Sequence, residues 1–461
     1  MTDGAASLVV SEKLSKNEES SHERGARADL AKIYRAAIDA VDPARLVARA
    51  LDGAIDGTVP QLIDNAPRVF LLAIGKASAA MALEIERRIG ASIVDALAVV
   101  PQTDAAIRSG ANPGSRIRFV AGAHPLPDES SMAAARAVLG MLRTIAADDL
   151  LIVALSGGAS AMCTMPPPNI ALEDKIAIVQ GLLRAGASIR ELNVVRKHLS
   201  ALKGGRIIGL SNGARVLGLI LSDVPGNELA TIGSGLTAAD WSTFGDAIAV
   251  LKRRALWGRA PESVRDYLER AAAGEVAETL KSDDPACERV INVIIGDNGL
   301  ALEGAEQAAA GLGYHVHRWK ELQGEADDVG RKLAEHLRGI TDERICVIAG
   351  GEPVVTVRGG GRGGRAQQCA LAMSIELAKV ARDRRIAALF AGTDGIDGPT
   401  DSAGAFASPA AVERGKRGGA SADVSLARND AYNFFRTTGD LFLTGPSGTN
   451  VSDVFIGLVN Y

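Results

Sequence analysis

The sequence predicts an α/β protein of two domains, each built on a mainly parallel sheet that lies between helices. Seven short apolar runs each stop at a loop of small, polar or charged residues. Fully apolar runs of this kind suit strands that are covered on both faces, as they are in a parallel sheet. The chain of 461 residues is also longer than one hydrophobic core usually supports.

The loops that follow these runs carry most of the chemically interesting residues. In parallel α/β sheets, ligands bind beyond the carboxyl ends of the strands. The loops combine bare backbone amides, a lysine and several carboxylates, a mixture that suits an anionic ligand carried with a metal ion. They are Gly75–Ser78, Ser156–Ser160, Ser222–Gly226, Gly296–Gly299, Gly350–Glu352, Gly392–Gly395 and Thr444–Asn450.

The composition limits the classes of partner. Aromatic residues make up only 4% of the chain and the formal charge is −4, so neither nucleic acid nor a membrane surface is an expected partner. The 4 cysteines lack metal-site spacing, which argues against a zinc site or a disulfide framework. No apolar stretch approaches the roughly 18 residues of a transmembrane helix. A cytoplasmic protein acting on small molecules is expected, and a homodimer stays open.

The first domain is expected to span residues 26–280, after a disordered or loosely packed tail at residues 1–25. Two alanine-rich helices in residues 26–52 should break near Asp42-Pro43. Strands and helices then alternate, which predicts a doubly wound sheet. The expected strands are Val69–Ile74, 95–100, 117–121, 150–155 and 215–222, with a helix from Ser78 to Arg88 after the first of them.

The second domain is expected to span residues 281–461, after a charged linker at Lys281–Pro285. A second series of strands and helices begins here, and a cleft between the two domains is the expected place for a bound molecule. The expected strands are Val290–Ile295, 345–349, 353–357, 386–390 and 441–443.

The loop Ser156-Gly157-Gly158-Ala159-Ser160 is a candidate phosphate site. Its glycines let the backbone approach a phosphate closely, and the next helix would direct free amides at the anion. The alternative is a tight turn that binds nothing.

Lys76 lies one residue beyond an expected strand and just before a helix. A lysine there can neutralise a transferring phosphoryl group, whereas a merely solvated lysine would oppose the helix dipole. A second cationic group lies in residues 189–203, expected to be one helix, where Asn193, Arg196, Ser200 and Lys203 share a face. That face suits an acid or a phosphate, or is simply solvated.

Several carboxylates also follow strands. Asp223 is placed to accept a proton from a substrate hydroxyl or to bind magnesium through water, and its alternative role is to cap a turn. The same readings apply to Asp297, Glu352, Asp394 and Asp397. Magnesium usually takes only one or two protein carboxylates, so not all of them can be ligands.

The glycine-rich segment 359–364 is ambiguous. Gly359, Gly361 and Gly364 satisfy GxGxxG between an expected strand, Val354–Val357, and an expected helix, Ala366–Leu377, which is the context of a dinucleotide fingerprint. However, the acidic residue that should follow about 20 positions later is missing. Arg365, at the start of the helix, suits phosphate recognition under either reading.

Taken together, these loops resemble the bacterial glycerate 2-kinase family, whose members are often labelled hydroxypyruvate reductase and carry the MOFRL motif in their C-terminal half. The resemblance runs in order from about residue 27 to the C-terminus. The matching stretches are Ile74–Ala77, Gly122–Asp128, Leu155–Gly158, Asn193–Ser200, Lys203–Gly205, Ser222–Gly226, Gly363–Arg365, Gly392–Thr400 and Thr444–Asn450.

The resemblance implies two α/β/α domains with an active site between them, and ATP with Mg²⁺ as the phosphoryl donor. Lys76, Asp223 and Arg365 match the family's proposed catalytic positions. One departure lies just beyond Arg365, where this chain has Ala366 and Gln368 in place of the family's usual Asn and Glu.

We therefore expect ATP-dependent phosphorylation of D-glycerate to 2-phosphoglycerate. The expected phosphate or substrate contacts are Ser156, Gly157, Gly158, Ser160, Arg196 and Lys203. The positions expected near the nucleotide or metal are Asp297, Asn298, Glu352 and Asp394. The alternatives are an NAD(P)H-dependent hydroxypyruvate reductase and a non-catalytic binder of small acids.

Overall fold

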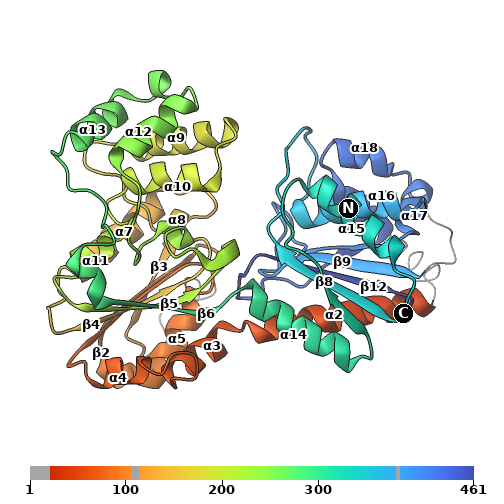
Figure 1. Ribbon diagram of the computed structural model, residues 1–461, viewed down its shortest axis with the longest axis horizontal. Helices are drawn as coiled ribbons and strands as arrows, with labels where there is room; N and C mark the ends of the chain where they lie inside the picture. Colours follow the sequence, from red (N-terminus) through yellow and green to blue (C-terminus); the bar gives the residue numbers. More distant parts are fainter. Residues whose placement is uncertain (1–20, 105–106, 108–113, 380–384) are drawn as a thin grey trace, which may run out of the picture. The chain divides into compact units, whose positions relative to one another are not determined.

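The chain forms two compact units, residues 43–297 and the combination of residues up to 42 with residues 298–461 (Figure 1). The computed structural model describes residues 21–104, 107, 114–379 and 385–461. Most of the expected N-terminal tail therefore lies outside the described residues. The part that is described, from Ser21 onward, is helical.

The division into units differs from the expected boundary at residue 280 in two respects. The strand expected to open the second domain, β6 (Val290–Gly296), instead forms the edge of the first sheet, where it pairs with β5. The first helix, α2 (Ser21–Ala40), belongs to the second unit, where it packs on α14 (Asn298–Gly311). The expected break near Asp42-Pro43 is confirmed, since α3 (Pro43–Leu51) starts there.

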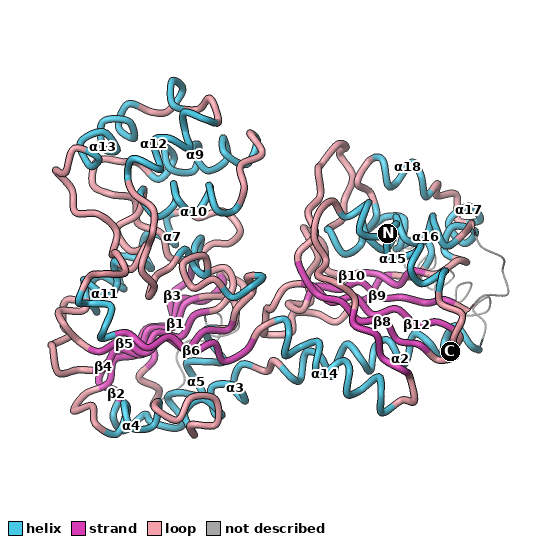
Figure 2. Tube along the Cα trace, viewed as in Figure 1, coloured by secondary structure: helices cyan, strands magenta, loops and turns pink. Residues whose placement is uncertain are grey.

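The sheet of the 43–297 unit, whose strands are magenta in Figure 2, is parallel throughout, as predicted. Its strand order is β3-β2-β1-β4-β5-β6, the order of a doubly wound dinucleotide-binding sheet. Side chains of β1 and β4 are buried along their whole length. The strands are β1 (Val69–Ile74), β2 (Ile93–Pro101), β3 (Ile117–Gly122), β4 (Leu150–Leu155), β5 (Arg215–Leu221) and β6.

Helices cover both faces of this sheet, and a further group of helices packs beyond one face (Figure 1). Helices α3 and α5 pack on one face, and α7 packs on the other. Helices α9, α10, α12 and α13 share a separate apolar core. The helices of this unit are α3, α4 (Val59–Asp64), α5 (Ser78–Ile89), α7 (Glu129–Leu142), α8 (Ala159–Met162), α9 (Leu172–Arg184), α10 (Ile189–His198), α11 (Arg206–Leu210), α12 (Phe244–Arg253) and α13 (Glu262–Ala272).

The second unit has a mixed sheet of order β11-β10-β9-β12-β8-β7. Strands β7 and β8 pair in parallel, whereas β12 runs antiparallel to β8 and β9, and β10 runs antiparallel to β9 and β11. The expectation of a mainly parallel second sheet was wrong, since an apolar run does not reveal strand direction. The strands are β7 (His315–Arg318), β8 (Ile345–Gly351), β9 (Ile386–Gly392), β10 (Gly404–Ala407), β11 (Leu441–Phe442) and β12 (Asp453–Val459).

The predicted strand Val354–Val357 is not formed. Its only ladder contact is an isolated bridge from Val354 to Glu325, and Val357 is 75% exposed. The apolar pattern of this segment therefore reflects a surface loop and not a buried strand.

Helices lie on both faces of the second sheet as well (Figure 1). Helix α2 is fixed to this unit by the Tyr34 hydroxyl, which donates to the Gly392 carbonyl at 2.7 Å, and by Asp29, which accepts from the Tyr314 hydroxyl at 2.8 Å. The helices are α2, α14, α15 (Ala326–Gly339), α16 (Arg365–Leu377), α17 (Ala411–Arg417), α18 (Ala422–Ala427) and α19 (Ala431–Thr438). Across the described residues, none of the helices combines the length and apolar character needed to cross a bilayer.

Candidate functional site

Lys76 lies where the strand order of the parallel sheet reverses. Strands β1 and β4 are neighbours, and Ile74 pairs with Leu155 at their carboxyl ends. The chain leaves β1 toward β2 and leaves β4 toward β5, on opposite sides. Adjacent loops diverge at such a switch point, which is why ligands bind there in open α/β sheets.

The Lys76 loop and the Ser156–Ser160 loop are joined by backbone hydrogen bonds. The Lys76 amide donates to the Gly157 carbonyl at 2.9 Å, and the Ala77 amide donates to Ser156 Oγ at 3.0 Å. Gly75 has φ +130°, and a Cβ there would lie 2.3 Å from Ser156 Oγ. The Ser156 hydroxyl, expected to contact phosphate, is thus engaged in fixing the position of Lys76.

The rest of the Ser156–Ser160 loop differs from the phosphate-binding turn that was expected. The helix that follows, α8, has only 4 residues, too few for a strong helix dipole. Gly158 has φ +87° and lies against the side chains of Lys76 and His124. Ser160 Oγ shares a hydrogen bond of 2.8 Å with Ser234 Oγ, and the Ser160 carbonyl accepts from Lys203 Nζ at 2.6 Å.

Lys203 reaches this loop from a turn and not from a helix. The helix expected over residues 189–203 ends at His198, because Ser200 Oγ accepts the amides of Leu202 and Lys203 and closes a turn. Arg196 remains on the last turn of α10 and still acts on Lys203 electrostatically. Burial, assisted by the charge of Arg196, lowers the pKa of Lys203 to about 8.

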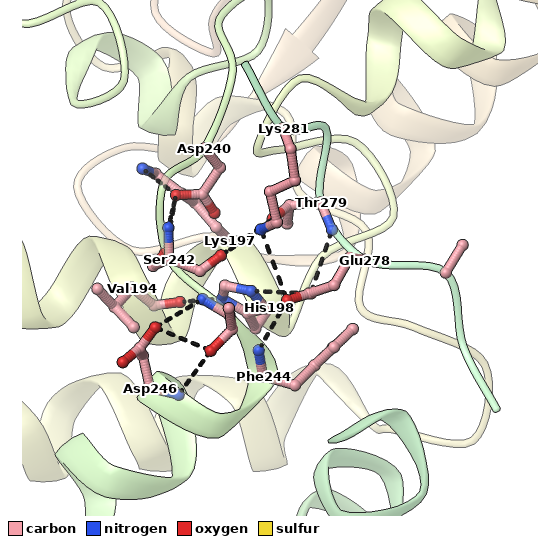
Figure 3. Close-up of polar contacts among 12 residues, drawn as sticks. Val194, Lys197, His198, Asp240, Ser242, Phe244, Asp246, Glu278, Thr279 and Lys281 are labelled. Carbon is pink, nitrogen blue, oxygen red and sulfur yellow. Dashed lines mark hydrogen bonds and ion pairs between the residues drawn. The ribbon is translucent and has the colours of Figure 1, made fainter. Parts of the chain in front are cut away.

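Lys197 and His198, the two residues that follow Arg196, each lie beside a carboxylate (Figure 3). Lys197 Nζ lies 3.1 Å from Asp240 Oδ1, and His198 Nε2 lies 3.3 Å from Glu278 Oε1. His198 Nδ1 is also within 2.8 Å of the Val194 carbonyl. These contacts attach α10 to the segments that precede α12 and follow α13.

Asp223 and Asp297 follow adjacent strands at the same edge of this sheet. Leu221 at the end of β5 pairs with Gly296 at the end of β6, and the Ser222 amide donates to the Gly296 carbonyl at 2.9 Å. Asp297 Oδ2 accepts from Asn227 Nδ2 at 2.6 Å. The edge that carries Lys76 thus also carries two carboxylates.

In the second unit, Arg365 is held by carboxylates at the first residue of α16. Its guanidinium donates to both oxygens of Asp453, at 2.6 and 3.1 Å, and also to Glu352. Burial alone would lower the pKa of Arg365, but Asp453 and Glu352 outweigh it and raise the pKa. Asp453 was not among the residues predicted from the sequence, where its signal was a lone carboxylate directly before an apolar run.

Asp397 caps the same helix from the loop after β9. It accepts the amides of Ala366 at 3.1 Å and Gln367 at 2.8 Å, and a Cβ on Gly364 would lie 2.1 Å from its Oδ1. Burial, together with the negative charge of Asp453, raises the pKa of Asp397 to about 7. A role for Asp397 in positioning Arg365 is therefore clearer than a role as a metal ligand.

The raised pKa of Asp397 gives a testable dependence of stability on pH. Because the folded-state pKa of about 7 exceeds the unfolded value, the folded protein binds more protons between about pH 4 and pH 7. Stability should therefore fall as the pH rises through that window. Relative to the Tm of wild type, the Tm of Asp397→Asn should therefore be higher at pH 8 than at pH 5. An unchanged difference would show that Asp397 does not titrate there.

Asn298 and Asp394, which were expected near the nucleotide or metal, have contacts that hold the backbone of this unit. Asn298 Nδ2 donates to the carbonyls of Val451 at 2.8 Å and Asp453 at 3.0 Å, which fixes the start of β12. Asp394 Oδ1 accepts the Ile396 amide at 3.1 Å. Among the described residues, no three His, Cys, Asp or Glu side chains are grouped so as to hold a metal ion.

The glycine-rich segment does not form a dinucleotide fingerprint. No strand precedes it, and Gly359 and Gly361 pack against the backbone of Arg428. A Cβ on Gly361 would lie 2.6 Å from the Arg428 carbonyl oxygen. The glycines are therefore explained by a close contact within the unit.

Two family models match the chain. Residues 29–269 match a family described as a domain of unknown function (DUF4147), and residues 345–453 match the MOFRL family. A glycerate 2-kinase of Pyrococcus horikoshii is 34% identical over 433 residues, covering 92% of this chain and 95% of that protein. Human glycerate kinase is 33% identical over 488 residues, with 92% and 91% covered.

Other relatives support the same grouping. A protein of Agrobacterium vitis named "Putative hydroxypyruvate reductase" is 34% identical over 439 residues, covering 90% of this chain and 94% of its own. The crystal structure of a glycerate kinase from Thermotoga maritima matches with a TM-score of 0.77 and 34% identity, covering 93% of this chain and 98% of that one. The expected two-part α/β fold and the resemblance are thereby confirmed, and the chain belongs to the glycerate kinase family that carries the DUF4147 and MOFRL regions.

Proposed function

We propose that this protein transfers the γ-phosphoryl group of ATP to the 2-hydroxyl of D-glycerate and releases 2-phosphoglycerate. The observation that carries the proposal is the position of Lys76, held rigidly at the strand-order reversal on a sheet edge that also bears Asp223. The names of the relatives support glycerate as the acceptor. Phosphoryl transfer requires mainly positioning and charge neutralisation, which fixed cations and a carboxylate supply.

Each residue has a specific role in this proposal. Asp223 orients the 2-hydroxyl and accepts its proton, while Lys76 and Arg365 neutralise the charge that develops on the transferring phosphoryl group. The pairing with Asp453 and Glu352 keeps the planar guanidinium of Arg365 charged and oriented.

Magnesium would be held by only one or two carboxylates together with the nucleotide phosphates. Asp297, Glu352 and Asp394 are the candidates, because each follows a strand. The ion would neutralise phosphate charge when bound.

Hydroxypyruvate reduction is the second candidate, favoured by the name of one relative. The glycine-rich segment gives it no support, because that segment follows a loop and packs on Arg428. Incubation with hydroxypyruvate and NADH or NADPH should leave the nicotinamide absorbance unchanged. Steady oxidation of the nicotinamide would establish the reductase in its place.

An assay with D-glycerate, ATP and magnesium tests the kinase directly. We expect ADP formation that depends on D-glycerate, and a ³¹P NMR spectrum of the product with phosphate on the 2-oxygen. A signal from 3-phosphoglycerate would correct the regiochemistry. Tight glycerate binding without ADP formation would favour a non-catalytic binder. Light scattering of the same preparation would decide whether the protein forms a homodimer.

A further inference from the structure

Three cationic side chains of the 43–297 unit gather behind the Ser156–Ser160 loop. Lys175 comes from α9, Arg196 from the last turn of α10, and Lys203 from the turn that follows. Lys203 Nζ touches the Ser160 carbonyl, which places this group directly against the switch-point loop. Burial, and then the charges of Lys203 and Arg196, hold the pKa of Lys175 well below its usual range.

Two of these cations are almost completely buried. Lys175 is 4% exposed and Lys203 is 1% exposed. Lys203 has its carbonyl partner, but Lys175 Nζ has no hydrogen-bond partner within the described part of the chain. Burial disfavours the charged form of a lysine that has no partner, so the ammonium is stable there only where something supplies the opposite charge.

Among the buried side-chain nitrogens without a hydrogen-bond partner in the described residues, that of Lys175 is the one ammonium. Lys197 and His198 follow Arg196 directly, and each faces a carboxylate, Asp240 or Glu278 (Figure 3). By contrast, none of the ion pairs found among residues 21–104, 114–379 and 385–461 includes Lys175, Arg196 or Lys203. Cys163 also lies close enough to act on Lys175 and Lys203, but burial raises its pKa to about 12, so it remains a neutral thiol.

We propose that Lys175, Arg196 and Lys203 form a receptor for the carboxylate of the substrate acid. The inference rests on the proposed function for the identity of that acid, D-glycerate. A carboxylate is the small terminal group of a three-carbon acid, and it suits a buried group of donors better than a triphosphate bearing a nucleoside. Arg196 and Lys203 were already expected from the sequence to contact an anion. Lys175 is a new positioning residue beside them. Its signal was a lysine on the buried stripe of α9, between Leu172 and Ile178.

Such a receptor should also make the protein select against uncharged polyols. Glycerol has the hydroxyls of glycerate but no carboxylate, so its entry would leave the cations unpaired. Such a loss discriminates far more strongly than a difference in shape.

Lys175→Met tests the proposal, because methionine keeps the length of the side chain and removes its charge. We expect the KM for D-glycerate to rise about 10- to 100-fold, the loss of one charged hydrogen bond, with the KM for ATP unchanged. We also expect an unchanged or higher Tm, since the variant no longer buries a polar nitrogen that has no hydrogen-bond partner in the described residues. Lys252→Met, at an exposed lysine of α12, should change neither the KM for D-glycerate nor the Tm.

Thermal shifts without ATP separate this inference from the proposed function. D-Glycerate should raise the Tm of wild type but not of Lys175→Met, glycerol should raise neither, and ATP should raise both equally. Loss of the shift by ATP or inorganic phosphate in the variant would identify a phosphate site and overturn the proposal. An unchanged KM for glycerate in an active variant would overturn it as well. A shift by glycerate that depends on Lys175, in a protein without kinase activity, would sustain the receptor and reject only the kinase.

Discussion

Replacing Arg365 by methionine should reduce kcat by about 10³-fold or more, the range seen when an arginine that stabilises a transferring phosphoryl group is lost. The effect should fall on kcat more than on the KM for glycerate, because the guanidinium acts on charge that develops in the transition state. Single-turnover measurements at saturating ATP and glycerate would resolve the chemical step.

A second variant separates a loss of kcat from a loss of stability. Arg365→Met leaves Asp453 buried without its bidentate partner, so a lower Tm is expected from that variant alone. Arg365→Met with Asp453→Asn removes both charges and should recover much of the Tm without recovering kcat. Recovery of activity in the double variant would mean that Arg365 only pairs with Asp453. Arg331→Met, at an exposed arginine of α15, is the matched control.

Replacing Lys76 by methionine should lower kcat by about 10²- to 10³-fold, as expected for the loss of one preorganised electrostatic contact. The fold should be retained, because the Lys76 backbone amide and Ser156 Oγ hold the loop by hydrogen bonds that the substitution leaves in place. Kinetics with saturating ATP, together with a Tm measurement, would check both expectations.

A matched lysine gives the control for this variant. Lys416→Met changes an exposed lysine on α17 and should leave kcat and Tm at wild-type values. Near-normal turnover in Lys76→Met would remove this lysine from the mechanism. A large loss of Tm would instead assign it a role in stability.

The alternation of apolar runs and loops was sufficient to predict most strands of the parallel sheet. Strands β1, β2, β3, β4 and β5 all form within a few residues of the expected limits. The predictions were weaker in the second unit, where β12 was missed and Val354–Val357 proved to be a loop. Both errors have one cause: a short apolar run has the same pattern in a central strand, an edge segment or an exposed loop.

The sequence by itself determined which residues follow the strands. Lys76, Ser156–Ser160, Asp223 and Asp297 all lie at strand ends, because local periodicity and glycine punctuation depend on near neighbours in the chain. The same local signals placed Arg365 at the start of its helix.

Only the tertiary structure decided which charged groups meet and how far burial shifts their pKa values. Asp453 lies 88 positions from the arginine that it binds, and Lys175 is buried beside Arg196 and Lys203 by the packing of α9 and α10. Long-range pairing and loss of solvent set the charge state of such groups, and neither is encoded in local spacing.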